Sequence, residues 1–366
     1  MIHQRVRILA DAGKDVETFA TGDGTRLLLL PYGARTLGLY APGSDESFYW
    51  FNPCLEQVDT ARALFAGSGW HNTGGDRTWL APELDVFFPD AKAERYVQPR
   101  ELDMSDYAVE RVGGGIQMSR KMMLHLARPD CDVRLELRKW LGPAANPLRH
   151  DREMTPLFER VEYAGYTQRT TLELSGEATQ HLPQLGIWNL IQLPPGGELI
   201  VPTYSRATPQ ACFGRIPPQH LQIEDRLLRL AVRFSGSHKI AVRGTTVCGR
   251  AGYLFPQGDR YALVVRNFSV NPSGEYVDVQ KADPGDLGYC LQVCRVDEPE
   301  FGSFFEMEYH APAIGAPPLP SQSEDISQVW AFRGARDVID PIARRLLGAG
   351  ISDHQGGLTS DPKSDA

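Results

Sequence analysis

Short apolar or alternating segments, separated by turn residues, run through almost the whole of this 366-residue sequence. Residues 131–140, CDVRLELRKW, place Val133, Leu135 and Leu137 on one face and charged side chains on the other, as in a half-exposed antiparallel strand. The 35 glycines and 27 prolines supply the many turns that such strands need. More than a dozen segments of this kind predict an all-β protein, a large antiparallel β-sandwich with few short helices.

Helical patterns are few. Residues 335–347 carry apolar side chains at helical spacing and predict one amphipathic helix, and residues 8–20 and 59–65 predict two short ones. Because no break in composition divides the chain, we expect one domain over residues 1–347, followed by a polar, glycine-rich, disordered tail over 348–366. Strands are expected at 25–40 as a hairpin, 47–51, 116–126, 131–140, 157–163 with 167–175 as a hairpin, 186–193, 198–202, 227–234, 238–243, 251–256, 260–268, 275–280, 288–296 and 302–310.

Charge and cysteine content exclude several classes of partner. The net charge is −8 and the sequence has no run of Lys and Arg, so we expect neither nucleic acid nor an anionic membrane surface as a partner. The six cysteines form no CxxC pair and are expected to be free thiols in a reducing compartment. Because the first residues lack the apolar stretch of a signal peptide, we expect a cytoplasmic protein.

Residues 69–83, GWHNTGGDRTWLAPE, concentrate glycines, aromatic side chains and reactive polar groups. Gly74 and Gly75 allow the backbone to take a positive φ or to lie close against another segment. Trp70 and Trp79 offer flat apolar surfaces that suit the CH face of a sugar ring. The stretch is therefore a candidate binding site.

The polar side chains of the same stretch could act on a ligand. His71 supplies an acid/base group, Arg77 a fork of donors, and Asp76 and Glu83 two carboxylates. The alternative is a buried turn in which Arg77 pairs with Asp76 or Glu83 and the tryptophans fill a core.

A second concentration of reactive groups lies in the predicted strand at 302–310. Side chains alternate along a strand, so Glu306, Glu308 and His310 share one face, with about 7 Å between neighbours. Neighbouring carboxylates disfavour each other's ionisation, which suits acid/base chemistry. An exposed outer face would show the same pattern. If the face is a site, we expect Arg77 and Glu308 to lie in one concave cleft, with Trp70 or Trp79 in its wall.

Four motifs, in their order along the chain, resemble the aldose 1-epimerase (galactose mutarotase) superfamily. They are LLLLPYGARTLGLYAPGSDESFYWFNP, GGDRTWLAPE, GIWNLIQLPPGGELIVP and EMEYHAPAI. The resemblance covers roughly residues 20–335. It implies a β-supersandwich whose concave face binds a sugar, and it places Glu308 at the position of the superfamily's general base.

The sequence departs from that superfamily at the general acid. The resemblance leads us to expect a histidine at Leu185, and His181, four residues earlier, could replace it only if the loop folds back. In the following segment, Trp188 and Gln192 are further candidates for the wall of the cleft, or ordinary core residues.

Two classes of function remain open. The first is a carbohydrate-active enzyme, either an epimerase or a lyase or hydrolase that reuses the fold, in which Arg77 binds a sugar hydroxyl or a uronate carboxylate. The second is a carbohydrate-binding protein without turnover. No phosphate-binding loop is present, so we expect no bound nucleotide, and the nucleophile elbow G-x-S-x-G of serine hydrolases is absent. We expect no cofactor. A divalent metal held by His71, Glu83, Glu306, Glu308 and His310 is a less favoured alternative, and the oligomeric state is not determined by the sequence.

Overall fold

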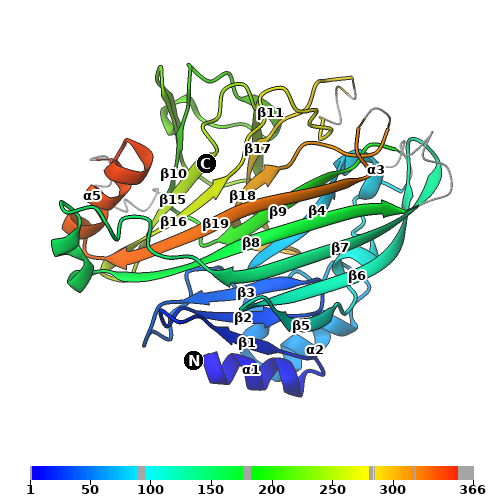
Figure 1. The fold of residues 1–366 in the computed structure, drawn as a ribbon, viewed down its shortest axis with the longest axis horizontal. Helices are drawn as coiled ribbons and strands as arrows, with labels where there is room; N and C mark the ends of the chain where they lie inside the picture. Colours follow the sequence, from blue (N-terminus) through cyan, green and yellow to red (C-terminus); the bar gives the residue numbers. More distant parts are fainter. Residues whose placement is uncertain are drawn as a thin grey trace, which may run out of the picture.

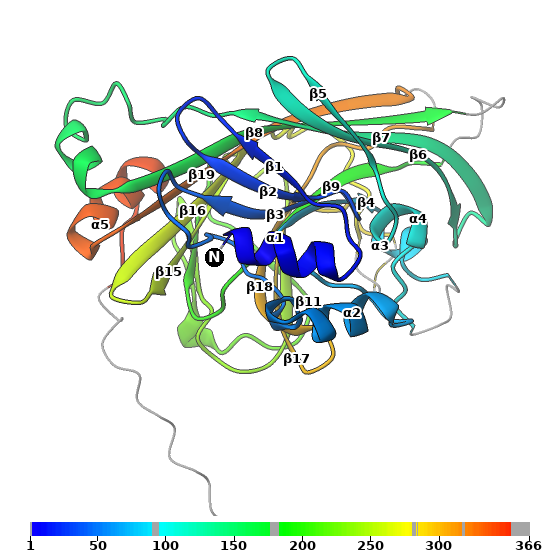
Figure 2. The same ribbon diagram turned by 90° about the horizontal axis from the view of Figure 1, so that it is seen from below.

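The computed structural model of the chain describes residues 2–89, 95–175, 183–279, 283, 285–316 and 319–352. Two large sheets dominate it, and their pairings are antiparallel throughout the described strands (Figures 1 and 2). This confirms the predicted β-sandwich class. The order of the nine-stranded sheet is β1 (Glu17–Ala20), β2 (Arg26–Leu30), β3 (Arg35–Tyr40), β4 (Asp76–Ala81), β9 (Gly186–Leu193), β18 (Gly302–His310), β17 (Leu291–Glu298), β14 (His238–Val242) and β11 (Gln210–Phe213).

The second sheet has ten strands and includes the longest ones. Figure 1 shows β6, β7, β8 and β19 side by side across the molecule. Its order is β12 (Leu221–Ile223), β13 (Leu227–Ala231), β10 (Glu198–Pro202), β15 (Arg250–Gln257), β16 (Arg260–Phe268), β19 (Gln322–Gly334), β8 (Glu162–Ser175), β7 (Cys131–Pro143), β6 (Gly115–Leu126) and β5 (Ala108–Val112).

Helices lie at the margins of the sheets. Apolar residues of α1 (Ile2–Asp11) and α2 (Val58–Ala66) pack on the outer face of β2 and β3, and α5 (Arg336–Leu347) packs on β15, β16 and β19 (Figures 1 and 2). The single-turn helices α3 (Glu83–Val86) and α4 (Arg100–Asp103) lie close to β4 and β6. None of the helices in the described part of the chain has the length and apolar character needed to cross a membrane.

The interior between the sheets combines an apolar core with a buried charged cluster. The Asp76 carboxylate of the nine-stranded sheet pairs with Lys139 (2.7 Å) and Arg266 of the other sheet and accepts a hydrogen bond from Tyr166 (2.7 Å). Such a cluster is stable only because each buried charge has an opposite partner. It fixes which face of β4 points inward.

Several predicted elements differ from those observed. The helix expected at 8–20 lies earlier, at Ile2–Asp11, because Gly13 leaves the helical conformation (φ 79°) and residues 17–20 pair with β2. The expected strand at 47–51 is irregular, and only Phe51 forms a bridge, to Gly74. The expected hairpin at 157–175 is a short 3₁₀ turn followed by the single strand β8. Residues 275–279 form no strand, and β4, β11, β12 and β19 were not predicted.

The beginning of the expected tail is packed. Ile351 is buried against the cluster around α5, and its backbone N–H donates to Asp340 Oδ1 (2.7 Å). Burial of this apolar side chain argues against disorder at residues 348–352. The remainder of the predicted tail, residues 353–366, lies outside the described residues.

Candidate functional site

A cavity of about 420 Å³ lies on the outer face of the nine-stranded sheet. Its floor comes from β4, β9, β18, β17 and β14, which are consecutive in that sheet. Cross-strand register puts Trp79 opposite Trp188, Glu306 opposite Cys294, and Glu308 opposite Gln292. Arg77, Glu308, Trp70 and Trp79 all line the cavity, so the predicted convergence of these residues is confirmed.

The Gly74-Gly75 turn directs β4 into this position. The two glycines have φ values of 94° and 79°, which side chains rarely tolerate. A Cβ at Gly74 would lie 2.3 Å from the Trp50 carbonyl oxygen, and one at Gly75 would lie 2.5 Å from that of Thr36. Glycine is therefore required at both positions by the close approach of the neighbouring segments.

Arg77 is fixed in the wall of the cavity by an ion pair and by contacts with two aromatic rings. Its Nη2 donates to Glu306 Oε1 at 2.6 Å, and Gln192 Nε2 donates to the same oxygen at 3.0 Å. The guanidinium lies over the Trp79 ring at 4.0 Å and the Trp70 ring at 5.0 Å. Gln192 itself does not line the cavity; it supports Glu306. The Arg77–Glu306 pair therefore presents a neutral, rigid edge.

Asp103, which the sequence analysis missed, orients both tryptophans. The indole N–H groups of Trp70 and Trp79 donate to its two oxygens at 2.6 and 2.8 Å, and Arg35 pairs with it at 2.9 Å. All these groups are buried or half-buried. Asp103 lies in the single-turn helix α4, and nothing in the local sequence marks it as a partner of β4.

Glu308 is a strongly perturbed carboxyl group in the cavity floor. Its Oε2 accepts from Trp188 Nε1 at 2.9 Å and lies 3.4 Å from Lys239 Nζ. Its Oε1 is buried and has no hydrogen-bond partner within the described part of the chain. Burial raises the pKa of Glu308 to about 8; Lys239 opposes the shift, while Glu306 and Glu83 add to it. A carboxyl group with such a pKa can exchange a proton near neutral pH.

Lys239 joins Glu308 to a second carboxyl group. Its ammonium lies 3.6 Å from Glu83 Oε2 and 4.7 Å from the centre of the Trp188 ring. Burial lowers the pKa of Lys239, but Glu308, Glu83 and Asp278 together raise it well above its ordinary value. Burial raises the pKa of Glu83, whereas Lys239 lowers it. Two carboxyl groups therefore share one ammonium, an arrangement that favours retention of a proton by one of them.

Asp278 completes this polar cluster. It accepts a hydrogen bond from the backbone N–H of Glu83 at 2.7 Å and another from Gln292 Nε2. Neither Lys239 nor Asp278 was singled out from the sequence. Lys239 occupies an ordinary-looking strand, and Asp278 lies in a stretch without regular structure.

Two of the predicted site residues lie elsewhere. His71 is buried outside the cavity, where Tyr32 Oη contacts its Nδ1 at 2.7 Å and the Gly67 carbonyl oxygen contacts its Nε2 at 2.9 Å. Asp76 belongs to the charged cluster between the sheets, because it precedes Arg77 and alternate strand residues face opposite ways. These positions do not support a catalytic role for His71 or ligand binding by Asp76.

His310 lies beside the cavity without lining it. Its ring stacks on that of Trp188 with the centroids 5.2 Å apart, and it is fully buried. Burial lowers the pKa of His310 well below its ordinary value, and Lys239 adds to that effect. The imidazole is therefore neutral at pH 7 and supports the position of Trp188.

A metal at this site would need a donor set other than the predicted one. Cys294, Glu306 and Glu308 offer donor atoms within 4.8 Å of one another. However, Arg77 and Lys239 already pair with the two carboxylates, and burial raises the pKa of the Cys294 thiol. A divalent cation would have to displace two cations and a thiol proton, so this donor set fits a metal poorly.

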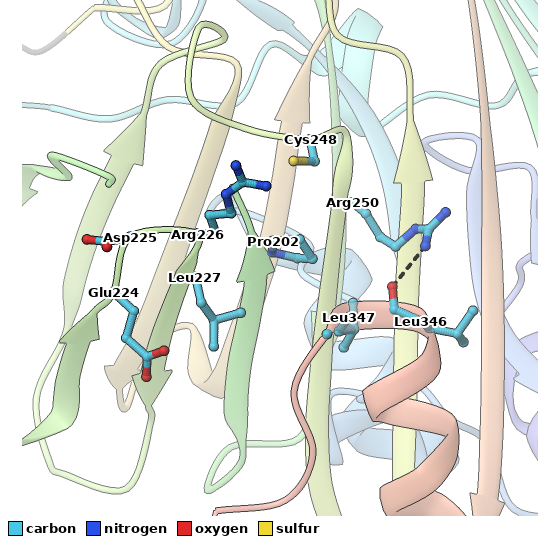
Figure 3. A pocket seen from close by; sticks show the side chains of 10 residues that line it. Pro202, Glu224, Asp225, Arg226, Leu227, Cys248, Arg250, Leu346 and Leu347 are labelled. Carbon is cyan, nitrogen blue, oxygen red and sulfur yellow. Dashed lines mark hydrogen bonds between the residues drawn. The ribbon is translucent and has the colours of Figure 1, made fainter. Parts of the chain in front are cut away.

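A second hollow, of about 860 Å³, lies between β10, β15 and the C-terminal end of α5 (Figure 3). Its lining includes Arg226, Cys248 and Arg250, and Arg250 donates to the Leu346 carbonyl oxygen at 2.8 Å. None of the site residues predicted from the sequence lines this hollow.

The fold and the cavity thus define an all-β sandwich protein with an aromatic and carboxylate-rich cavity on one sheet. A family described as a family of unknown function, DUF6786, matches residues 6–356, and the chain belongs to that family. No curated protein matches the chain. Among solved structures, it is similar to the alpha-galactosidase from Lactobacillus brevis, with 10% identity and a TM-score of 0.34 over 92% of this chain and 42% of that chain. The chain spans less than half the length of that structure.

Proposed function

We propose that this protein binds a carbohydrate in the cavity on the nine-stranded sheet and performs acid/base chemistry on it, with Glu308 as general base. The observation that carries the proposal is the state of the Glu308 carboxyl group. It is buried in the cavity floor, its pKa is raised to about 8, and its Oε1 has no partner in the described part of the chain. The motif order that resembles the aldose 1-epimerase superfamily places its general base at this same residue.

Glu83 is the best candidate for the general acid. Opening a sugar hemiacetal needs a base on the anomeric hydroxyl and an acid at the ring oxygen. Glu83 lines the same cavity as Glu308, its pKa is raised by burial, and both carboxyl groups contact Lys239. The pair shares one proton, and because the pKa of Glu308 is about 8, Glu308 is the base in the state in which that proton lies on Glu83.

The lining of the cavity suits a ring with polar edges and apolar faces. Tryptophan side chains at 70, 79 and 188 provide apolar surface, and Asp103 holds the first two in place. Gln292 Oε1 and Glu308 Oε1 are buried acceptors without partners among the described residues. Hydroxyl groups of a sugar would satisfy such acceptors, which are costly when left unpaired.

A carbohydrate-binding protein without turnover is the second candidate. The observation that favours it is Leu185, which stands where the resemblance leads us to expect a histidine. In the structure Leu185 is buried and pairs through its backbone with Ile314, so it contributes no acid. In that case Glu308 would only accept hydrogen bonds from the ligand.

A panel of sugars separates the two candidates. Each sugar is followed by NMR for anomer exchange, epimerisation, elimination or bond cleavage, with wild-type protein and Glu308→Gln compared at equal concentration. For an enzyme, we expect Glu308→Gln to reduce turnover by about a hundred- to ten-thousand-fold, because general-base catalysis typically supplies that factor. Affinity should change little, since glutamine keeps an acceptor.

Glu324→Gln serves as the matched control, because Glu324 is exposed on β19 in the other sheet. It should leave turnover unchanged. Equal rates for wild type and Glu308→Gln would remove Glu308 from the mechanism. Binding without any reaction would favour the binding protein over the enzyme.

A further inference from the structure

The charges that line the cavity are unbalanced. Two cationic side chains, Arg77 and Lys239, face five carboxyl groups among the described lining residues. Arg77 pairs with Glu306, and Lys239 is shared by Glu308 and Glu83. The carboxyl groups remain in excess even when one proton is held between the latter two.

Both cations already have acidic partners. Arg77 has its charge beside Glu306 at 2.6 Å and its face on Trp79, while Lys239 contacts two carboxyl groups and the Trp188 ring. Arg77 Nε and Nη1 are buried donors without a partner in the described part of the chain, so the guanidinium can still donate hydrogen bonds. Its charge, however, is already balanced by Glu306, and a carboxylate or phosphate on a ligand would add to a surplus of acidic groups. The balance of charge therefore disfavours a uronate.

The acidic and amide groups of the lining, in contrast, can still accept hydrogen bonds. Asp278 accepts hydrogen bonds from two uncharged donors, the Glu83 backbone N–H and Gln292 Nε2. Gln292, which donates to Asp278, is directly opposite Glu308 across β17 and β18, and the buried Oε1 atoms of both residues have no partners in the described chain. An ammonium group offers several donors together with the missing positive charge.

From this arrangement we propose that the ligand is cationic, an amino sugar whose ammonium group lies between Glu308 and Gln292 and faces Asp278. The inference rests on the proposed carbohydrate-binding function and adds the ligand's charge to it. Hydrogen bonds to charged groups are about twice as strong as neutral ones, so the ammonium should add affinity relative to a hydroxyl in the same place.

Paired hexoses test the charge directly. Glucosamine and glucose, galactosamine and galactose, and mannosamine and mannose differ only by an ammonium in place of a hydroxyl group. We would titrate each into the full-length wild-type protein near neutral pH by calorimetry, and include glucuronate as an anion and cyclohexylamine as a cation without hydroxyl groups. The bound amino sugar should have an affinity about tenfold higher than its neutral partner, and glucuronate should bind more weakly than either.

Asp278→Asn removes one negative charge from the cavity while keeping its size. We expect it to reduce about tenfold the preference for the amino sugar, measured as the ratio of its affinity to that of the neutral partner. Glu324→Gln removes the same charge from the outside of the other sheet and should leave the preference intact. An unchanged preference in Asp278→Asn would contradict the placement of the ammonium beside Asp278.

The outcomes separate this inference from the proposed function. If neutral hexoses bind as tightly as their amino partners, the inference is wrong while the carbohydrate function stands. If cyclohexylamine binds as tightly as any amino sugar, the cavity selects a cation but the carbohydrate function is wrong. If no compound binds, both are wrong.

Discussion

Glu308 connects residue-scale electrostatics with the stability of the fold. Its pKa is raised from 4.5 to about 8 by burial, so the folded state holds this proton more tightly than the unfolded state. The associated stabilisation is complete below pH 4.5 and is lost as the pH rises through about 8. Ionisation of Glu308 therefore lowers the free energy of unfolding.

The first prediction uses this pH window. Glutamine has no proton to lose, so only the wild type loses stability as the pH rises. The free energy of unfolding of Glu308→Gln minus that of wild type should therefore increase by about 1–4 kcal/mol from pH 5 to pH 9. Urea unfolding at a series of pH values measures the difference. Glu324→Gln should show no such trend, and a pH-independent difference for Glu308→Gln would contradict the raised pKa.

Asp103 gives a second prediction at the residue scale. Asp103→Asn leaves the buried Arg35 guanidinium without its counter-charge, and removing one partner of a buried ion pair typically costs about 3–5 kcal/mol. The control is Asp337→Asn, whose pair with Arg160 is exposed and should contribute much less to stability. Thermal unfolding of both variants compares them, and equal losses would show that Asp103 does not hold the tryptophan wall.

Sequence patterns identified some of these residues and not others. Strand alternation placed Glu306 and Glu308 on one face, and the Gly74-Gly75 pair marked the turn before Arg77. The contributions of Lys239, Asp278 and Asp103 depend on partners distant in sequence, which no local pattern encodes. For His71 the residue type suggested chemistry, but packing against Tyr32 decided its position.

At the scale of elements, prediction succeeded where both sides of a strand are apolar or clearly alternate. The bounds of β9, β10, β16 and β18 were predicted as observed. Strand β19 was missed, since its first half, QSEDISQ, is polar on both faces and pairs with β8 and β16 only in the folded sheet. Strand β4 was missed for a similar reason, because its side chains that face the second sheet, Asp76 and Thr78, are polar.

The segment that follows α5 provides a prediction at this scale. Ile351 is 4% exposed and belongs to the apolar cluster around that helix. Ile351→Ala should cost about 2–5 kcal/mol, as large-to-small substitutions in a core do. Ile326→Ala, at a position on β19 that is 43% exposed, is the control and should change stability little. Denaturant midpoints measure both, and a neutral Ile351→Ala would restore the view that the tail begins at residue 348.

At the scale of the whole molecule, the cavity depends on the sandwich behind it. One face of β4 and β18 contributes Arg77, Glu306 and Glu308 to the cavity, and the opposite face contributes Asp76 and Tyr309 to contacts with the second sheet. The class of fold followed from the number and spacing of strands. The pairing of Asp76 with Lys139 and Arg266 across the two sheets could not, because it requires knowledge of which strands face each other.

The six tryptophans allow the central claim to be tested in one experiment. Trp70, Trp79 and Trp188 line the cavity, whereas Trp140 and Trp330 lie on β7 and β19 of the other sheet. We would label the tryptophans with ¹⁵N, assign the indole signals by substitution, and titrate the amino and neutral hexoses into the protein. The account predicts that a bound sugar shifts the indole signals of Trp70, Trp79 and Trp188 and leaves those of Trp140 and Trp330 in place. Shifts confined to Trp140 and Trp330, or no shift with any sugar, would contradict it.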